Sequence, residues 1–342
     1  MIDFFEVSGN DYQMGVLIGR HFSDYLQSIE AGFAAMLPGH IELVKRLEDN
    51  LSRRLKGCLD EIYGRADGAG VARDVMLLIM FPEIYGGTDG CTTLYMKTSR
   101  GAMLAHNEDS STMNLDNVAL VKYCYDGWQL VAYTSAIRLA GSAFAFNSKG
   151  LAFSSNHIFG GDRDMNEISR FIVLRDIINS GSIEEAAEKV RSIDVASPFN
   201  LNILDYERGT LCNIERDLYD LHCEFISDRY THSNHYCTKP YDSERVPVSS
   251  VFRRNKSMEL LRSLGDDASL SDLFNILGYE GESYDDSVFE RRERYKERIC
   301  TVASFGMDSA TKEIRILDFI GKGCFSFDTN GNLLGTFPLS RP

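Results

Sequence analysis

The sequence predicts an α+β fold in which helices pack outside antiparallel sheets. Apolar residues recur with helical spacing through the first quarter of the chain. After residue 90 the chain changes to short segments rich in β-branched and aromatic residues, which are typical of strands. The resulting order of helices, strands, helices and strands indicates an α+β protein, because a doubly wound parallel sheet would alternate strand and helix throughout.

The first quarter of the chain is predicted to be almost entirely helical. Between Asp11 and about Arg73 the apolar residues lie three or four positions apart. We expect Pro38 to end one helix and open the next, and the glycine-rich segment Gly64–Gly70 to end the helix that follows. The apolar run Val75–Phe81 is far shorter than the roughly 20 residues that span a bilayer, so it is predicted to be a buried helix or strand.

The rest of the chain is predicted to consist of strands interrupted by two helical regions. The expected strands are Thr92–Lys97, Val118–Tyr125, Trp128–Thr134, Leu151–Ser155, Leu201–Asp205, Thr210–Ile214, Ile299–Phe305 and Glu313–Phe319. The expected helical regions are Asn166–Ser192, and Val248–Leu264 followed by Leu270–Leu277.

Composition excludes several classes of function. The 342 residues include 36 Lys and Arg against 50 Asp and Glu, and the formal net charge of −14 repels phosphate backbones and anionic lipids. The first residues are acidic where a secretion signal would be basic, and no long apolar stretch follows them. The eight cysteines form no CxxC pair, which favours a reducing compartment. We therefore expect a cytoplasmic protein with no nucleic-acid partner and no membrane partner.

The junction Gly86–Thr93 is the most informative part of the sequence, since no GxGxxG, P-loop or GxSxG motif is present. A glycine-rich turn leads directly into Cys91, at the point where helices give way to strands. Such a turn can hold the backbone in a conformation that other residues resist. If the Cys91 sulfur attacks the Gly90 carbonyl, an N-to-S acyl shift gives a thioester that water opens, and the product chain begins at Cys91.

That cleavage would give the thiol a proton acceptor of its own. The new α-amine of Cys91 has a reference pKa of about 7.7–8.0, which suits a general base at neutral pH, whereas the uncleaved nitrogen is a non-basic amide. One residue would then supply both nucleophile and base. The alternative is that Cys91 is a small buried residue that starts a strand.

Six segments in a particular order and spacing support the reactive interpretation. They are Asp11–Gly19, Gly90–Thr93, His106–Asp109, Phe146–Leu151, Thr231–His235 and Thr301–Asp308. With these segments the chain resembles, over nearly its whole length, the acyl-coenzyme A:6-aminopenicillanic acid acyltransferase (cysteine peptidase C45) family of N-terminal-nucleophile hydrolases. The resemblance implies an αββα four-layer sandwich that is made as an inactive precursor and cleaves itself before Cys91.

The resemblance also implies which residues surround the nucleophile. The family's aspartate, eighteen residues after the cysteine, matches Asp109, whose carboxylate can orient the new amine; a turn aspartate is the alternative. The family's oxyanion asparagine matches Asn234, and Asn156 is a second oxyanion candidate unless it is a loop or strand-edge residue. The family's late arginine matches Arg298, three residues before Thr301, where it can brace Asp109, although neighbouring arginines leave this register open.

The neighbours of Asp109 depart from the family pattern, and the one histidine pair in the sequence does not predict a metal site. Glu108 and Ser110 flank Asp109 where the family often has aromatic residues, and because these neighbours can line the acyl pocket, the acyl preference stays open. His232 and His235 have HxxH spacing on an extended segment, which lacks the geometry of a helical zinc pair. We expect no metal and no resident cofactor, with acyl-CoA open as a co-substrate.

The sequence thus predicts a self-processing N-terminal cysteine amidohydrolase or acyltransferase with Cys91, Asp109, Asn234 and Arg298 in its site. Residues 1–90 would form a helical small chain and residues 91–342 the catalytic chain, both staying together as one folded domain. N-acyl amides, peptides and acyl thioesters remain open as substrates. The alternatives are an amidase like choloylglycine hydrolase or penicillin V acylase, and a binding protein that keeps the fold and never cleaves.

Overall fold

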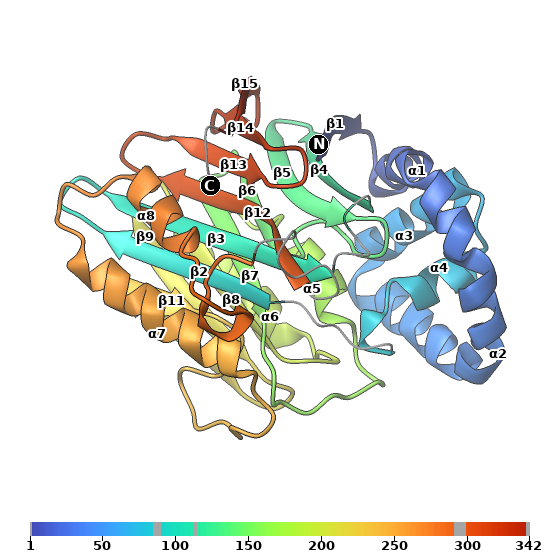
Figure 1. Cartoon of the computed structure of the whole chain (residues 1–342). Helices are drawn as coiled ribbons and strands as arrows, with labels where there is room; N and C mark the ends of the chain where they lie inside the picture. The colour runs from blue at the N-terminus through green and yellow to red at the C-terminus, as the bar shows by residue number, and fades with distance from the viewer. Residues whose placement is uncertain (1, 85–89, 112–114, 116, 291–298, 340–342) are drawn as a thin grey trace.

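The computed structural model describes residues 2–84, 90–111, 115, 117–290 and 299–339. In these residues two β-sheets lie face to face and helices cover the outer face of each, which gives four layers in the order α, β, β, α (Figure 1). Three apolar clusters follow this layering, one beneath each outer helical layer and one between the sheets. The predicted α+β class and the αββα sandwich are confirmed.

The first sheet has eight strands and includes a strand from the beginning of the chain. In sheet order the strands are β1 (Asp3–Ser8), β4 (Val118–Tyr125), β5 (Trp128–Ser135), β6 (Phe144–Asn147), β7 (Leu151–His157), β8 (Phe199–Asp205), β9 (Thr210–Arg216) and β10 (Leu221–Ile226). β1 runs parallel to β4, and the other neighbouring strands are antiparallel. The sequence pattern did not reveal β1, because an edge strand with mostly exposed or half-buried residues lacks a clear apolar alternation.

The second sheet has seven strands, all antiparallel to their neighbours. In sheet order they are β11 (Arg229–His232), β2 (Gly90–Lys97), β3 (Ala102–Ser111), β12 (Ile299–Asp308), β13 (Ile314–Asp318), β14 (Gly323–Phe327) and β15 (Leu333–Pro338). β2 therefore lies inside the sheet, between β3 and β11, and its first residues meet strands from distant parts of the chain.

The space between the sheets is apolar in one part and polar in another. Phe144 of the first sheet stacks on Phe305 of the second, with ring centroids 5.1 Å apart. Near the start of β2 the buried residues are instead polar, and include Thr93, His106 and Asn156. Buried polar groups need hydrogen-bond partners, so this part of the core is organised by specific contacts rather than by packing alone.

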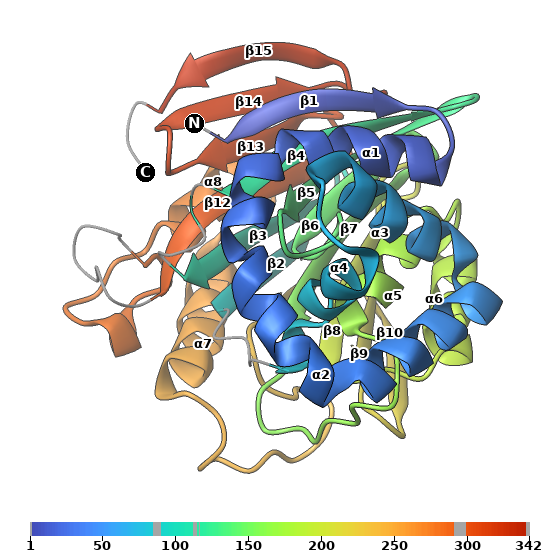
Figure 2. The same cartoon turned by 90° about the vertical axis from the view of Figure 1, so that its right-hand side faces the viewer.

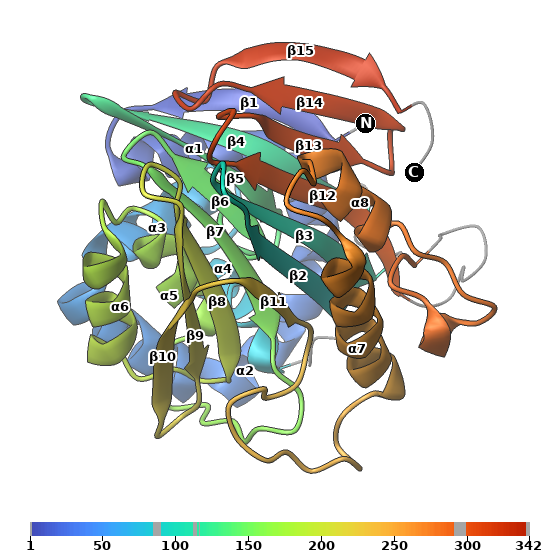
Figure 3. The same ribbon diagram turned by 90° about the vertical axis from the view of Figure 1, so that its left-hand side faces the viewer.

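Helices from the first quarter and the middle of the chain cover the first sheet (Figure 2). They are α1 (Asp11–His21), α2 (Ser23–Arg54), α3 (Lys56–Ala69), α4 (Arg73–Ile79), the 3-10 turn η1 (Pro82–Ile84), α5 (Arg170–Ile177) and α6 (Ile183–Ser192). The second sheet is covered by α7 (Val248–Ser263) and α8 (Leu270–Leu277), with the 3-10 turn η3 (Tyr284–Asp286) beside α7 (Figure 3). Among these described helices none is long and apolar enough to cross a membrane.

One predicted helix end was wrong and another was confirmed. Pro38 lies inside α2 rather than between two helices, because the buried residues before and after it, Leu26 and Val44, belong to the same core. At Pro38, tertiary packing therefore overrides the local signal. α3 ends within the predicted glycine-rich segment, at Ala69, with Gly70 as a left-handed C-cap. Gly64, inside α3, lets α1 approach closely: a Cβ there would lie 2.1 Å from the Tyr12 carbonyl oxygen.

The predicted helical region Asn166–Ser192 is two helices. α5 ends at Ile177, and the Ser182 side chain caps α6 by accepting a hydrogen bond from Glu185 N at 3.1 Å. Between the helices, Asn147 Nδ2 donates to the carbonyls of Ile178 and Ser180 at 3.0 and 2.9 Å. These contacts satisfy carbonyls that the end of α5 leaves open.

Candidate active site

Cys91 lies at the beginning of β2, in the part of the strand that pairs with β3. Residue Gly90 pairs with Asp109 and Cys91 with Glu108 across β2 and β3. Because side chains alternate along a strand, Cys91 shares its face with Tyr95, which belongs to the cluster between the sheets. Cys91 is 3% exposed, so its surroundings are set by a small number of buried groups.

The backbone of Cys91 is held from both sides by polar side chains. Its N–H donates to Asn234 Oδ1 at 3.0 Å, and its carbonyl accepts from Arg253 Nη1 at 2.5 Å. Arg253 Nη2 also donates to Asn234 Oδ1 at 2.6 Å, and Arg253 is 3% exposed. A buried guanidinium from helix α7 thus contacts the backbone of Cys91.

Asn234 comes to Cys91 in an orientation that its hydrogen bonds determine. Its Oδ1 accepts from two donors, and its Nδ2 donates to the His157 carbonyl at 2.9 Å. If the amide were turned over, its NH₂ group would face the two donors and its oxygen would face the carbonyl, so this orientation is the one that the contacts allow. The sequence predicted an oxyanion donor at this position. In this geometry the amide presents its oxygen to the Cys91 nitrogen and uses one of its two N–H groups on the His157 carbonyl.

The Cys91 thiol faces a buried carboxylate that the sequence analysis assigned only to the acyl pocket. The thiol donates to Glu108 Oε2 at 3.1 Å, and Glu108 is 2% exposed. Arg138 Nη1 lies 3.9 Å from Glu108 Oε1, and His106 Nε2 lies 4.0 Å from Oε2. A thiol, a carboxylate that accepts its hydrogen bond, and a guanidinium therefore meet at the start of β2.

A chain of hydrogen bonds fixes the protonation of His106. Asn156 Nδ2 donates to the carbonyls of Ser233 and His232 at 2.9 and 3.2 Å, so Asn156 Oδ1 is the acceptor for the Thr93 hydroxyl at 2.8 Å. The Thr93 oxygen must then accept from His106 Nδ1, 3.0 Å away, which leaves the lone pair on Nε2. Burial lowers the pKa of His106 to about 3, so the ring is neutral.

Asn156 itself serves a positioning role in this structure. Its N–H groups contact the backbone of the two residues before Asn234, and the Cys91 carbonyl lies 3.5 Å from Nδ2. The sequence proposed Asn156 as a second oxyanion donor. In the structure its amide nitrogen donates to the backbone at the end of β11, and these bonds position Asn234.

Asp109 lies next to the Gly90–Cys91 peptide, on the other side from Glu108. A Cβ built on Gly90 would be 3.2 Å from Asp109 Oδ2, and Thr301 Oγ1 donates to Asp109 Oδ1 at 2.7 Å. The bulge in β12 between Thr301 and Ala303 keeps this hydroxyl opposite the carboxylate. The predicted brace Arg298 lies outside the described residues.

Comparisons with known proteins decide the family. The profile of the acyl-coenzyme A:6-aminopenicillanic acid acyl-transferase family matches residues 96–317. The chain belongs to this acyl-transferase family. A curated relative, the 40 kDa form of acyl-coenzyme A:6-aminopenicillanic-acid-acyltransferase from Emericella nidulans, is 26% identical over 291 residues, which cover 80% of this chain and 78% of the relative.

Solved structures with low similarity were also found. A mutant of conjugated bile acid hydrolase from Clostridium perfringens has a TM-score of 0.48 at 13% identity, covering 72% of this chain and 96% of the other. Penicillin V acylase from Agrobacterium tumefaciens has a TM-score of 0.45 at 12% identity, covering 70% and 86%. Membership of the acyl-transferase family makes this chain an enzyme of the N-terminal-nucleophile hydrolase and acyltransferase class.

This acyl-transferase family member has a second cluster with the same residue types, Glu215, His232 and Cys237. His232 donates from Nε2 to Glu215 Oε1 at 2.9 Å and from Nδ1 to the Ser233 carbonyl at 2.7 Å, so both ring nitrogens carry protons. Burial opposes this charge, but Cys237 and Glu215 outweigh it and raise the pKa of His232 to about 10. The HxxH histidine thus has no lone pair for a metal.

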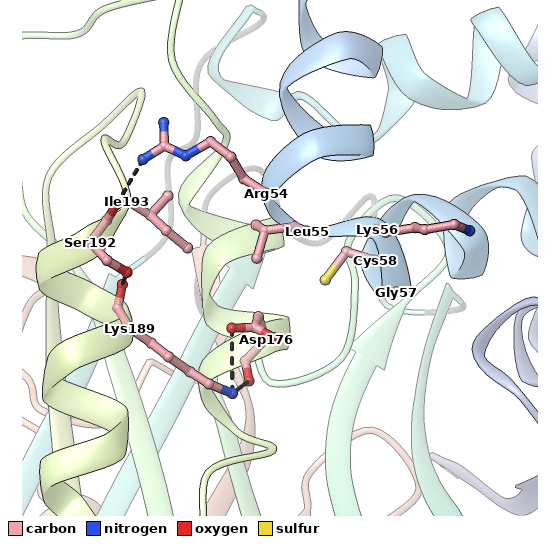
Figure 4. A pocket seen from close by; sticks show the side chains of 9 residues that line it. All are labelled: Arg54, Leu55, Lys56, Gly57, Cys58, Asp176, Lys189, Ser192 and Ile193. Carbon is pink, nitrogen blue, oxygen red and sulfur yellow. Dashed lines mark hydrogen bonds and ion pairs between the residues drawn. The ribbon is translucent and has the colours of Figure 1, made fainter.

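A pocket away from Cys91 lies between the α2–α3 junction and helices α5 and α6 (Figure 4). It has a volume of about 460 Å³. Its polar groups already have partners: Arg54 donates to the Ser192 carbonyl at 2.7 Å, and Lys189 to the Asp176 carbonyl at 3.0 Å. Burial raises the pKa of the Cys58 thiol far above its ordinary value. This pocket lies where residues from before and after position 90 meet, and it lacks a reactive group.

Proposed function

We propose that the chain is a self-processing N-terminal cysteine amidohydrolase or acyltransferase that acts on a small N-acyl amide, peptide or acyl thioester. One observation carries this proposal: Asn234 and Arg253 hold the backbone of Cys91 while the thiol of the same residue donates to Glu108. The arrangement fixes the nitrogen that cleavage would free and provides an acceptor for the thiol proton. Family membership supports the acyl-transfer chemistry.

In self-cleavage, Glu108 is the proton acceptor that the uncleaved chain needs, because an amide nitrogen is not a base. The thiol proton passes to Glu108 as the Cys91 sulfur bonds to the Gly90 carbonyl carbon. The carbon–nitrogen bond then breaks, and the nitrogen takes that proton to become an amine. Water adds to the resulting thioester and releases the Gly90 carboxylate and the free thiol.

In the cleaved enzyme the same nitrogen becomes the base. The Asn234 oxygen that accepts from the amide N–H at 3.0 Å would accept from the amine and direct its lone pair. The nearby Arg253 guanidinium disfavours a second positive charge, which lowers the amine pKa and keeps the amine a proton acceptor at neutral pH. Attack on a substrate gives an acyl-Cys91 intermediate, which water resolves in a hydrolase and an amine resolves in a transferase.

The two products of cleavage would stay together, because they share a core. The largest apolar cluster joins residues of α1–α4 to residues of β4–β9, α5 and α6. A buried charge network crosses the same boundary: Glu61 accepts from Arg65 Nη2 at 2.8 Å, from Tyr123 at 3.0 Å and from Arg175 Nε at 2.7 Å. β1 adds backbone hydrogen bonds to β4. We therefore expect residues 1–90 and 91–342 to remain one folded unit after cleavage.

Denaturing electrophoresis and mass measurement of the purified chain test this proposal. Cleavage at Gly90–Cys91 gives fragments of about 10 and 28 kDa by proportion of length. We expect both fragments, co-eluting in gel filtration, and only the intact chain in Cys91→Ala. An intact chain after long incubation, with no labelling of Cys91 by an acylating probe, would contradict the proposal and favour a non-cleaving binding protein.

A further inference from the structure

The Cys91 cluster contains three buried atoms of the types that bind zinc. Cys91 Sγ, a His106 ring nitrogen and a Glu108 carboxylate oxygen all lie within 4.8 Å of one another. The sulfur is 3.1 Å and His106 Nε2 is 4.0 Å from Glu108 Oε2. Tetrahedral zinc with ordinary bond lengths holds such ligands about 3.3–3.6 Å apart, so small side-chain adjustments would suffice.

His106 supplies the observation that points to a ligand. Its Nε2 is completely buried and makes no hydrogen bond among the described residues. The hydrogen-bond chain through Thr93 and Asn156 leaves a lone pair on this atom. Buried polar atoms in native proteins nearly always have a partner, so an unused lone pair beside a thiol and a carboxylate needs an explanation.

We propose that Cys91, His106 and Glu108 form a three-ligand binding site for one Zn²⁺ ion. Thiolate, imidazole and carboxylate are the ligands that zinc takes in proteins, whereas magnesium and calcium prefer oxygen alone. Zn²⁺ bound to one thiolate, one carboxylate and one neutral imidazole makes a cluster with no net charge, which limits the cost of burying it. The sequence predicted no metal, because the HxxH pair was the one spacing in it that suggested ligands.

The surrounding contacts match those of a metal site. The Nδ1 of His106 bonds to Thr93 and fixes the ring, as the outer partners of metal-bound histidines do. Arg138 lies 3.9 Å from Glu108 Oε1, the oxygen that faces away from the thiol contact. Zinc would enter by the route that a substrate of Cys91 requires, and the fourth coordination position would be left to water.

Zinc at this site would block the nucleophile reversibly. Binding displaces the thiol proton and occupies the sulfur lone pair that attack requires. The inhibition of self-cleavage and turnover rests on the proposed function, whereas the binding itself does not. The site would therefore make the chain sensitive to free zinc whichever acyl substrate it uses.

Calorimetric titration of the full chain with Zn²⁺ tests the binding directly. We expect one ion per chain, with an affinity reduced at least about tenfold in His106→Gln and in Glu108→Gln. Cys237→Ser, in the second cluster, should bind zinc as the parent does. Circular dichroism confirms that each variant is folded.

Cobalt provides a readout that does not depend on activity. Co²⁺ bound to the parent should give thiolate-to-cobalt absorption that is absent in Cys91→Ala and present in Cys237→Ser. No stoichiometric binding, unchanged affinity in His106→Gln, or an absorption that follows Cys237 would each overturn the inference. Normal self-cleavage without zinc binding would remove this inference and leave the proposed function standing.

Discussion

In the described part of the chain two clusters combine cysteine, histidine and glutamate, and they differ in the hydrogen-bond partners of their histidines. In one, His106 contacts a hydroxyl through Nδ1 and keeps a lone pair on Nε2. In the other, both nitrogens of His232 donate to oxygen acceptors, so the ring is a buried cation. The histidine is thus neutral in the first cluster and a buried cation in the second.

The carboxylates differ in the same way. Glu215 accepts from His232, from the backbone N–H groups of Cys237 and Thr238, and from the Thr238 hydroxyl. Burial opposes its charge, but these donors prevail and lower its pKa to about 2. Glu108 instead faces the thiol of Cys91. The residue types in a cluster do not distinguish a reactive site from a structural ion pair, whereas the direction of each hydrogen bond does.

The largest contrast is expected between the two cysteines. Cys91→Ala should abolish self-cleavage and reduce acyl transfer or hydrolysis at least about a thousandfold, because nucleophile and base are lost together. Cys237→Ala should keep both. Initial rates and intact-mass spectra of the two purified variants check this. Equal losses in both variants would mean that the clusters had been assigned wrongly.

The two glutamates should separate chemistry from stability. Glu108→Gln removes the proton acceptor and should slow self-cleavage by about 10²–10⁴-fold without unfolding the chain. Glu215→Gln leaves a buried His232 cation without its partner and should cost about 3–5 kcal/mol of unfolding free energy. Cleavage time courses and denaturant unfolding measure the two effects. Rapid cleavage in Glu108→Gln would exclude the proposed acceptor.

The ion pair of the second cluster should give a pH-dependent stability. The pKa of His232 rises from 6.5 to about 10, so its contribution is complete below 6.5 and is lost as the pH rises through 10. The pKa of Glu215 falls from 4.5 to about 2, so its contribution is complete above 4.5 and is lost as the pH falls through 2. His232→Gln should therefore destabilise the chain most between pH 4.5 and 6.5.

Denaturant unfolding at pH 5.5 and 9.5 checks this window. The control His235→Gln should show the opposite trend. Burial lowers the pKa of His235 to about 4, so the stability that neutral His235 contributes to the parent falls as the pH drops below 6.5. His235→Gln should therefore destabilise the chain less at pH 5.5 than at pH 9.5. The same destabilisation by His232→Gln at both pH values would contradict the buried cation.

Two adjacent arginines on α7 allow a finer comparison. Arg253 contacts the Cys91 backbone, whereas Arg254 lines a pocket with Cys237. Arg253→Gln should raise the pKa of the Cys91 amine and move the acid limb of the kcat/KM profile up by about one pH unit, because a neighbouring positive charge is lost. Arg253→Lys should recover part of the shift, and Arg254→Gln should cause none. The same acid limb of the kcat/KM profile in all variants would show that Arg253 does not lower the pKa of the Cys91 amine.

The sequence was sufficient where the signal is local or carried by the family. Helical spacing and β-branched segments gave the α+β class, and the glycine-rich junction drew attention to Cys91. The roles of Glu108, His106 and Arg253 depend on strand register and on contacts between residues up to 162 positions apart, which no local pattern encodes. Pro38 shows the same limit in the fold, since the core on both sides of it keeps one helix continuous.

In the proposed function, scission behind Cys91 creates the base that its thiol needs. The most direct measurement follows activity and intact mass together as the freshly made precursor matures. We predict that activity rises in proportion to the cleaved fraction and that the large fragment begins at Cys91. Full activity in a chain that remains unbroken between Gly90 and Cys91 would contradict the account.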